Sequence, residues 1–500
     1  MTKSTTKKSG TAKKKTSAKV QQSRFKAVLS RLKKDQSLVG RIFLGIAIVL
    51  ALTYVLAVYA AFTTSIIPGK YLGLGFLLSV LATLGLVYGL TKRGPAAKYS
   101  RAVVVLALVG IVINIGIFSI GTSTRSFINS LQQTDSQTYI DYAIVALKKD
   151  AIKLDTLDQT VGVLEVDNSN EVREAVADKT PSTVAVYATP TESILALRES
   201  RAQMAVLTGA YLDELREGAN NVLYLELEVL STFRVKSTQA AAPKTNLSEP
   251  FIVYISGIDT YGSISTTSRS DVNILAVVNP KTHTILFVNT PRDYYVQLHG
   301  TTGTKDKLTH AGLYGIDQSE KTLEDLYGID INYNVKINFT SLEKIVNTVG
   351  GIEVDSEYNF SSGGFSFTTG KNQLDGKQAL AFSRERYSFD GGDRTRGQNQ
   401  MRVLTALIGK ISEPSVIVNY QAILGSLNGV FQTNMTSGDM TTIIRNQLDS
   451  MAKWNISSIS VDGTGASQPT YSMGAQNLYV MIPDEASLTS AKNKINSVLR

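Results

Sequence analysis

The chain contains no cysteine and only three histidines among its 500 residues. Without cysteine, a disulfide scaffold, a thiolate nucleophile and a thiolate zinc site are all excluded. The histidines are His283, His299 and His310, and three such residues argue against a multi-histidine metal centre.

Acidic residues are nearly absent from the first 101 residues. That segment holds 18 of the 51 basic residues but only one of the 42 acidic residues, Asp35, which leaves 33 basic and 41 acidic residues in 102–500. The net charge of +9 therefore does not indicate a uniformly basic surface, because the positive excess lies at one end. The length is that of about three domains.

Three long stretches lack any charged residue, namely 42–67, 71–90 and 102–121. A bilayer core of about 30 Å needs about 20 apolar helical residues, and each stretch is long enough. A cleaved signal peptide does not explain the first stretch, because two more follow it. The sequence therefore predicts three transmembrane helices.

The flanking charges predict the orientation of these helices. Thirteen basic residues precede the first stretch, and four more lie between the second and third, at Lys92, Arg93, Lys98 and Arg101. The positive-inside rule puts both segments in the cytoplasm. We therefore expect a multi-pass protein of the cell membrane, with its N-terminus in the cytoplasm and residues 122–500 outside the cell.

The basic tail, residues 1–41, is rich in serine, threonine and lysine up to about Val20 and is typical of disorder there. DNA binding is one interpretation, but the tail has neither interleaved aromatic residues nor a helix-turn-helix pattern. An orientation signal and contact with anionic lipids explain the same charges, so we expect no nucleic-acid partner.

Residues 122–234 alternate between helical and extended patterns, which predicts a small α/β accessory domain. We expect helices over 138–151 and within 193–216, and strands over 160–166 and 223–235. Residues 235–250 are rich in serine, threonine, alanine and proline and form a predicted linker.

Residues 251–500 have the pattern of an α/β domain, with apolar strands followed by amphipathic helices. A capping-box pattern, T-S-L-E, opens the helix expected at 340–349. Strands alternating with helices predict a sheet covered on both faces, with a site at the strand ends. The expected strands are 251–258, 272–278 and 284–289, and the expected helices are 318–327, 340–349, 373–384, 396–411 and 485–499.

Two aspartates stand at predicted strand tips. Asp259 follows the first strand of this domain, and Asp271 opens the second after a polar loop. Carboxylates without thiolate or imidazole partners suit a hard cation such as Mg²⁺. Each aspartate alone is more often a turn residue, so the pair carries the prediction.

Arginines are concentrated in four motifs of the same region. Guanidinium groups bind phosphate in a fixed, bidentate manner, so the cluster favours a polyanion such as a pyrophosphate. Any one arginine alone is more often ion-paired at the surface. Lys307 is similarly ambiguous, and we leave it outside the predicted site. The motif arginines are Arg269, Arg292, Arg384, Arg386, Arg394 and Arg396, and Gln400 shares a helix face with Arg396.

Five segments resemble, in order, the characteristic blocks of the LytR-CpsA-Psr family: I-S-G-I-D, S-R-S-D-V-N-I-L, V-N-T-P-R-D-Y-Y-V, D-G-K-Q-A-L-A-F-S-R-E-R and G-G-D-R-T-R-G-Q-N-Q. The match covers roughly residues 251–401. The three-span anchor and accessory domain resemble the capsule-associated, CpsA-type members of streptococci.

This resemblance implies an α/β/α sandwich that holds a polyprenyl phosphate or pyrophosphate lipid. It also implies a phosphotransferase, dependent on Mg²⁺ or alternatively Mn²⁺, that moves a lipid-linked glycopolymer such as capsular polysaccharide onto peptidoglycan. By the resemblance, Asp259 and Asp271 hold the metal and take part in catalysis with Arg292. The pyrophosphate would be held by Arg269, Arg292, Arg384, Arg386, Arg396 and Gln400.

Asp393 is close enough in sequence to these residues to be a candidate base for the incoming hydroxyl. A carboxylate at a helix N-terminus is an equally good interpretation.

Two other classes of function are compatible with the sequence. A membrane-anchored transcriptional regulator or attenuator would need the basic tail to bind DNA. A non-catalytic carrier or assembly factor for lipid-linked precursors, with a pyrophosphatase side activity, would keep the arginines but tolerate loss of the aspartate pair.

Overall fold

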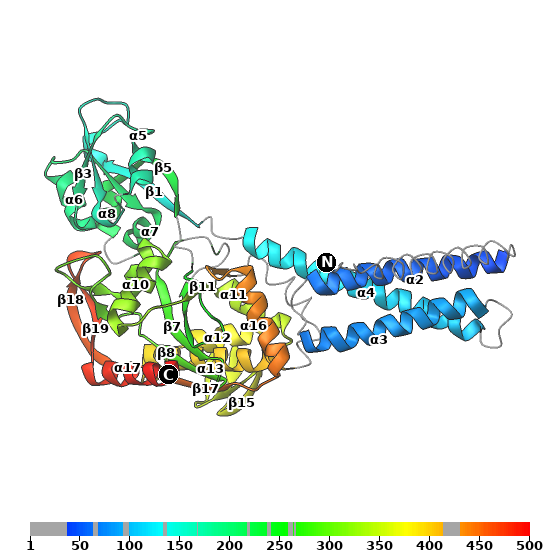
Figure 1. The fold of residues 1–500 in the computed structure, drawn as a ribbon. Helices are drawn as coiled ribbons and strands as arrows, with labels where there is room; N and C mark the ends of the chain where they lie inside the picture. Colours follow the sequence, from blue (N-terminus) through cyan, green and yellow to red (C-terminus); the bar gives the residue numbers. More distant parts are fainter. Residues whose placement is uncertain are drawn as a thin grey trace, which may run out of the picture. The chain divides into compact units, whose positions relative to one another are not determined.

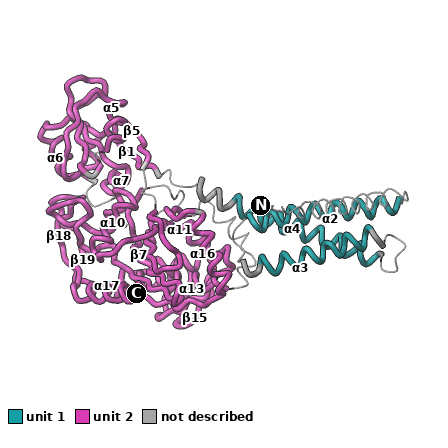
Figure 2. Tube along the Cα trace, in the orientation of Figure 1, with its two compact units in different colours: residues 1–126 teal, residues 127–500 magenta. Residues whose placement is uncertain are grey.

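A computed structural model of the chain describes residues 38–63, 69–93, 100–133, 138–167, 169–217, 221–237, 242–258, 264, 267–413 and 431–500. The chain forms two compact units, residues 1–126 and 127–500 (Figure 2).

The first unit contains three apolar helices that are long enough to cross a membrane. They are α2 (Leu38–Thr63), α3 (Gly69–Tyr88), which continues into a π-helical turn (Gly89–Arg93), and α4 (Ser100–Gln133). Large apolar side chains such as Leu52, Leu84 and Val112 point outwards and are exposed, as expected for helices that face lipid.

The predicted spans agree with these helices in number but differ in their bounds. The first helix begins before residue 42, and α4 continues well beyond the expected end at residue 121. The apolar part of α4 ends at Ser126, so hydropathy located the spanning segment but not the helical continuation after it.

The accessory domain has a five-stranded mixed sheet in the order β3-β2-β4-β1-β5. Its strands β1, β3 and β5 are labelled in Figure 1. One core cluster packs beneath α5, around Val172 and Val176, and the other beneath α6 and α7, around Leu197 and Leu212. Its elements are β1 (Thr138–Leu147), β2 (Thr160–Leu164), α5 (Asn170–Ala177), β3 (Thr183–Tyr187), α6 (Pro190–Arg198), β4 (Met204–Thr208), α7 (Gly209–Glu217), α8 (Asn221–Glu226) and β5 (Leu227–Ser237).

One prediction for this domain was wrong: the helix expected at 138–151 is for most of its length the strand β1, which pairs along its whole length with β5. The helices expected within 193–216 correspond to α6 and α7, but the strand β4, whose five residues are all buried, lies between them and was not expected. A short, continuously apolar run has no periodicity that separates a buried strand from a buried helix.

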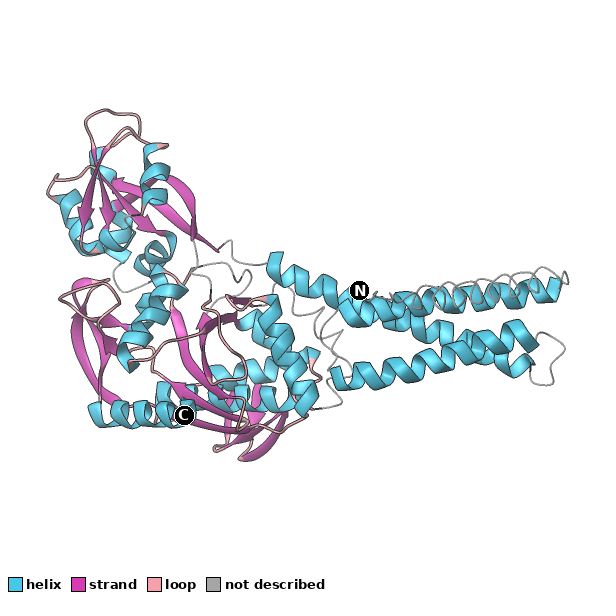
Figure 3. Cartoon of the chain, in the orientation of Figure 1, coloured by secondary structure: helices cyan, strands magenta, loops and turns pink. Residues whose placement is uncertain are grey.

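The second domain of residues 127–500 is built on a six-stranded sheet in the order β16-β11-β6-β7-β8-β17. Figure 3 shows strands and helices of the chain in separate colours. β6 is parallel to β11 and antiparallel to β7, while β8 is antiparallel to β7 and parallel to β17. The strands are β6 (Phe251–Ile258), β7 (Ser270–Asn279), β8 (Thr284–Asn289), β11 (Tyr333–Asn338), β16 (Gln432–Thr433) and β17 (Asn455–Ser460).

Helices cover both faces of this sheet, as predicted. Leu323 of α10 (Ile316–Tyr327) and Leu488 of α17 (Glu485–Leu499) belong to the core on one face. Met401 of α13 (Gly392–Ile411) belongs to the core on the other. The result is the α/β/α sandwich expected from the sequence.

A smaller layer lies beside α13 and has its own aromatic core, which includes Phe360, Phe367 and Phe382. The helix α11 (Phe339–Thr348) starts earlier than predicted, because its N-cap is Asn338 and not Thr340. A capping box formed by Asp375 and Gln378 opens α12 (Gly376–Arg384).

The remaining elements are short or peripheral. They are η2 (Lys148–Asp150), η3 (Glu165–Asp167), β9 (Tyr295–Val296), β10 (Asp306–Lys307), α9 (Leu308–Ala311), η4 (Gly312–Tyr314), β12 (Ile352–Ser356), β13 (Phe360–Ser362), β14 (Phe365–Phe367), β15 (Gly370–Leu374), α16 (Ser437–Ser450), β18 (Gly463–Thr470) and β19 (Gly474–Pro483).

Candidate functional site

One edge of the six-stranded sheet gathers the polar strand ends. The pairing directions place the last residues of β6, β8, β11 and β17 at the same edge as the first residue of β7, Ser270. In such sheets, sites form outside the carboxyl ends of the parallel strands. The segments that carry the predicted site residues begin at this edge.

Asp271 and Arg292 are brought together here. Nη1 of Arg292 lies 2.8 Å from Oδ1 of Asp271, and the two side chains are only 16% and 8% exposed. The hydroxyl of Thr309 donates to the same Oδ1 at 2.9 Å, and its backbone N–H donates to the carbonyl of Arg292. A predicted metal ligand and a predicted phosphate ligand thus form one buried, hydrogen-bonded pair.

Two further charged residues, which are not among the predicted site residues, lie at this edge. Asp293 forms an ion pair with Lys307, and both side chains are largely buried. Nε of Arg292 lies 3.9 Å from Oδ1 of Asp293. Lys307, which the sequence left outside the site, is thus paired with the residue that directly follows Arg292.

The N-terminal turn of α13 supplies another group of charges. Arg396 forms an ion pair with Asp393 one turn earlier, and Gln400 lies one turn further along the helix. The helix approaches the sheet closely at Gly397, where a Cβ atom would lie 2.4 Å from Nδ2 of Asn289, the last residue of β8. Glycine at this position therefore allows the arginine-bearing turn to reach the sheet edge.

The electrostatics of Asp393 link the α13 turn to the β8 end. Burial raises the pKa of the Asp393 carboxyl above its ordinary value; the Arg396 guanidinium opposes this shift, and the Asp293 carboxylate adds to it. Arg292 and Arg386 also lower the pKa of Asp393, by smaller amounts. These five residues therefore share one electrostatic neighbourhood.

Arg386 has a neighbour of its own at the rim. Its guanidinium carbon lies 4.6 Å from the centre of the Tyr387 ring, and the hydrogen bond to the Tyr387 hydroxyl raises the pKa of Arg386. Tyr387 is 84% exposed. Arg386 thus lies beside an exposed tyrosine, while the charges of Asp393 and Asp293 still act on its pKa.

Arg384 and Arg269 contact other partners. The guanidinium carbon of Arg384 lies 4.0 Å from the centre of the Phe339 ring, at the end of β11. Nη1 of Arg269 lies 2.7 Å from Oε2 of Glu214, a residue of the accessory domain. Both arginines are attached to segments that meet the polar edge, but their contacts differ from those of Arg292, Arg386 and Arg396.

The second predicted metal ligand, Asp259, lies outside the described residues. Ile258, the residue before it, pairs with Ser270, the residue before Asp271. Among the residues that the structure describes, no three histidine, aspartate or glutamate side chains gather into a metal-binding group. The donor set of the predicted metal site is thus represented by Asp271 alone.

Asp271 is chemically suited to a hard cation. Both of its described contacts are made by Oδ1, and its Oδ2 takes part in neither. A buried carboxylate oxygen at a strand end fits Mg²⁺, which binds through one or two carboxylates plus water and phosphate oxygens.

Comparison with known proteins identifies relatives of part of the chain. Residues 227–497 match the LytR_cpsA_psr family. A polyisoprenyl-teichoic acid–peptidoglycan teichoic acid transferase, TagU of Enterococcus faecalis, is 35% identical over 268 residues, which are 53% of this chain and 85% of the relative. TagU of Bacillus cereus is 30% identical over 257 residues, which are 51% of this chain and 81% of the relative.

Solved structures give matches over the same proportion of the chain. The crystal structure of B. subtilis TagV is 29% identical and aligns with a TM-score of 0.44, covering 50% of this chain and 98% of TagV. The three apolar helices and nearly all of the accessory domain precede the residues that match the family.

Proposed function

Because the chain belongs to the LytR_cpsA_psr family, we propose that it is a membrane-anchored transferase that moves a polyprenyl-pyrophosphate-linked glycopolymer onto peptidoglycan. The TagU relatives are named as transferases that move polyisoprenyl-linked teichoic acid to peptidoglycan. The observation that supports the proposal most strongly in this chain is the cluster of Arg292, Arg386 and Arg396 around buried carboxylates.

The arginine cluster suits a pyrophosphate head group. Arg292 and Arg396 are only 16% and 12% exposed, so contacts that they make are poorly screened by water. Each is ion-paired with an aspartate, which fixes the orientation of its guanidinium group. A planar guanidinium group has five donors, so it can bind phosphate oxygens while it keeps its aspartate.

A half-buried aliphatic strip suits the polyprenyl tail. Central strands of a sheet covered on both faces are normally fully buried, but alternate residues of β6 and β11 are only partly buried. The register between β6 and β11 places these partly buried residues on one face of the sheet. This is the face that packs against Leu404 and Ile408 of α13. The strip consists of Val253, Ile255, Val335, Ile337 and the neighbouring Val272.

A divalent cation is part of the proposal. Mg²⁺, or alternatively Mn²⁺, would be held by Asp271 with Asp259, and when bound it would neutralise charge on the pyrophosphate oxygens. Phosphoryl transfer depends on alignment and charge stabilisation more than on covalent chemistry of the protein. The arginines supply that stabilisation where the leaving phosphate gains charge.

Asp393 is the proposed general base. Its side chain is largely buried, its Oδ1 is ion-paired with Arg396, and burial raises the pKa of its carboxyl above the ordinary value. A peptidoglycan hydroxyl would attack the sugar-side phosphorus and give its proton to Asp393. The bond from that phosphorus to the bridging oxygen breaks, and polyprenyl phosphate leaves with the bond electrons.

The membrane anchor fits this substrate. The lipid-linked donor lies in the membrane, and tethering the enzyme to the same surface raises the local concentration of both. We propose that residues 127–500 lie outside the cell, as the positively charged flanks of the three helices indicate. Capsular polysaccharide is the glycopolymer that we propose.

The proposal is tested with the full-length protein in proteoliposomes, supplied with a synthetic polyprenyl-pyrophosphate oligosaccharide and soluble peptidoglycan chains. We expect a glycan joined to peptidoglycan through a phosphodiester, detected by mass spectrometry, and loss of this product after chelation of divalent cations. Asp271→Asn should abolish the product. Asp141→Asn is the matched control, because Asp141 pairs with Arg234 at 2.7 Å on the accessory domain.

Three outcomes would contradict the proposal. Release of free glycan phosphate with water as the only acceptor would indicate a pyrophosphatase. Tight lipid binding without turnover would indicate a carrier. Normal transfer by Asp271→Asn would remove Asp271 from the reaction.

A further inference from the structure

The accessory domain is joined to the family-matched domain through a shared core. Leu313 lies in η4 of the family-matched domain, yet it is buried among the core residues of the accessory domain, together with Tyr211 and Leu215 of α7. The hydroxyl of Thr208 donates to the carbonyl of Leu313 at 3.4 Å. The accessory domain is therefore packed against η4 and is not merely linked to it by the chain.

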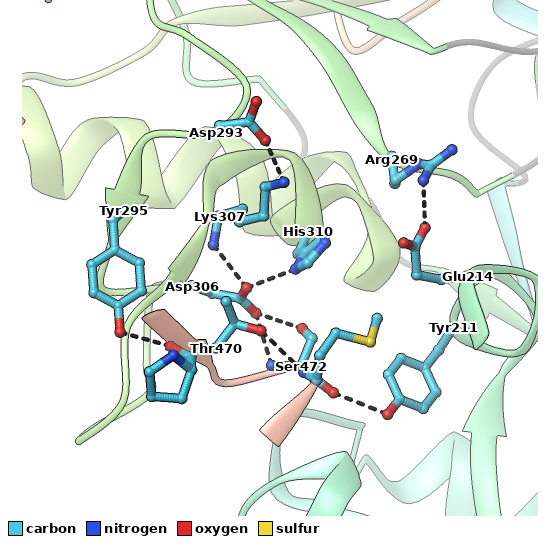
Figure 4. A network of polar contacts seen from close by, with 12 residues as sticks. Tyr211, Glu214, Arg269, Asp293, Tyr295, Asp306, Lys307, His310, Thr470 and Ser472 are labelled. Carbon is cyan, nitrogen blue, oxygen red and sulfur yellow. Dashed lines mark hydrogen bonds and ion pairs between the residues drawn. The ribbon is translucent and has the colours of Figure 1, made fainter. Parts of the chain in front are cut away.

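A buried network of hydrogen bonds also connects the two domains at this interface (Figure 4). The hydroxyl of Tyr211 donates to the carbonyl of Ser472 at 2.9 Å, and the backbone N–H of Ser472 donates to Oδ2 of Asp306 at 2.9 Å. Oδ1 of Asp306 lies 2.7 Å from Nδ1 of His310, in α9. Asp306 is fully buried, so removal of any partner would leave its charge poorly satisfied.

The interface lies next to the backbone segment 268–271, which carries Arg269 and Asp271. At Gly312, a Cβ atom would lie 2.6 Å from both the carbonyl oxygen of Ser268 and the backbone nitrogen of Ser270. The backbone of η4 therefore touches the backbone on both sides of Arg269. Asp271 follows immediately, and Thr309 of α9 holds its carboxylate.

Glu214 of α7 completes this arrangement. Its carboxylate lies 2.7 Å from Nη1 of Arg269, and the side chains of Glu214 and Arg269 are 15% and 30% exposed. In Figure 4 the contact uses one end of the guanidinium group, and the other nitrogens of Arg269 point away from Glu214. Glu214 thus fixes the direction of Arg269 and leaves donors of the same group unoccupied by this contact.

We propose that Glu214 is a positioning residue of the transferase site, through which the accessory domain orients Arg269 for the pyrophosphate. This inference rests on the proposed function. Glu214 precedes residues 227–497, which match the family, so this contribution comes from a part of the chain that the family match does not include. An arginine that is already oriented loses less conformational entropy on binding than a free one.

The test measures binding of a short-chain polyprenyl pyrophosphate to the full-length protein in detergent, together with the kinetics of transfer. Glu214→Ala should raise Kd and KM about three- to tenfold, the cost of ordering one long side chain, with kcat nearly unchanged. Glu214→Asp should recover part of the loss. Glu226→Ala is the matched control, because Glu226 pairs with Arg198 at 2.7 Å within the accessory domain, and should leave Kd unchanged.

A double-mutant cycle separates positioning from general damage to the fold. Glu214 acts through Arg269, so Glu214→Ala should have no further effect on Kd when Arg269 is already alanine. Additive effects would overturn the proposal. Tighter binding by Glu214→Ala would also overturn it, because it would show that Glu214 competes with the lipid for Arg269.

A readout that needs no lipid keeps this inference separate from the proposed function. Hydrogen–deuterium exchange of a peptide containing residues 267–272 should be faster in Glu214→Ala than in Glu226→Ala. If the wild type binds no lipid, the proposed function fails, and the positioning of Arg269 by Glu214 is then judged by hydrogen–deuterium exchange alone. Equal exchange of this peptide in the two variants would overturn the positioning role of Glu214.

Discussion

The carboxylate of Asp271 lies 2.8 Å from the guanidinium group of Arg292, which joins a predicted metal ligand to a predicted phosphate ligand. The two residues meet because Asp271 is the second residue of β7, Arg292 follows the end of β8, and β7 and β8 are antiparallel neighbours. Their contact means that a change at either residue removes an ion-pair partner of the other. Variants at one position therefore report on both.

We expect Arg292→Ala to weaken binding of the polyprenyl pyrophosphate by about 1.5–3 kcal/mol, the usual value for lost charged hydrogen bonds. Arg292→Lys should recover only part of this loss, because an ammonium group keeps the charge but not the planar fork. Calorimetric titration of the full-length protein measures both. Equal affinity of all three proteins would exclude Arg292 from the head-group site.

The fall of kcat/KM at acidic pH, the acid limb of its pH profile, should report the ionisation of Asp393. Because the pKa of Asp393 is raised, the base form is lost, as the pH falls, at a higher pH than for an ordinary aspartate. Arg396 lowers this pKa, so Arg396→Ala should move the limb of kcat/KM to still higher pH. Asp393→Asn should reduce kcat by about 10²–10⁴-fold and remove the limb; an unchanged limb would assign the base elsewhere.

Gly397→Ala should destabilise the protein and lower transfer activity. The new methyl group would meet Asn289, whose amide donates to the hydroxyl of Ser460 at 3.0 Å, and overpacking of this kind costs about 1–3 kcal/mol. Gly409→Ala lies on the same helix with no atom within 4 Å of the added Cβ, and should be neutral or slightly stabilising. Thermal melts of the two variants make the comparison; equal melting temperatures would contradict the close approach.

Glu320 should make stability depend on pH. Burial raises its pKa to about 7, so the unfolded chain ionises before the folded one as the pH rises. The stability present below the ordinary pKa of 4.5 is therefore lost as the pH approaches 7, by on the order of 1–3 kcal/mol. Glu320→Gln cannot ionise and should melt at a higher temperature than the wild type at pH 8 but not at pH 4.

An exposed glutamate provides the control for this measurement. Glu174→Gln, on the outer face of α5, should follow the wild type at both pH values. A difference at pH 8 between wild type and Glu320→Gln no larger than this control would show that Glu320 titrates normally.

The sequence predicted most of the family-matched domain because its strands are long and apolar and its helices amphipathic. The strands at Phe251–Ile258 and Thr284–Asn289 and the helix Glu485–Leu499 have the predicted bounds. It failed at β1 and β4, because residues 142–147 of β1 and 204–207 of β4 are continuously apolar and the period of two is lost there. Whether these segments form strands or helices is decided by pairing with strands far away in the chain. The local sequence pattern contains no information about that pairing.

The candidate site was predictable to the extent that its residues sit in recognisable sequence motifs. Arg292, Arg386 and Arg396 were selected from the arginine-containing motifs and Asp393 from its position beside them, and these four residues share one electrostatic neighbourhood. Lys307 was left outside the site and Glu214 was not considered, because their contacts depend on partners that only the tertiary fold supplies. The metal ligation and head-group roles assigned to these residues stay predictions.

The burial of Leu313 in the core of the accessory domain has a practical consequence for dissecting the protein. The serine- and alanine-rich stretch before β6 invites truncation there, as though it separated two independent folds. A fragment starting at that stretch would carry Leu313 and the tip of the β18–β19 hairpin without the helices that shield them, and would aggregate or sample altered conformations. The smallest soluble piece worth expressing should begin before β1.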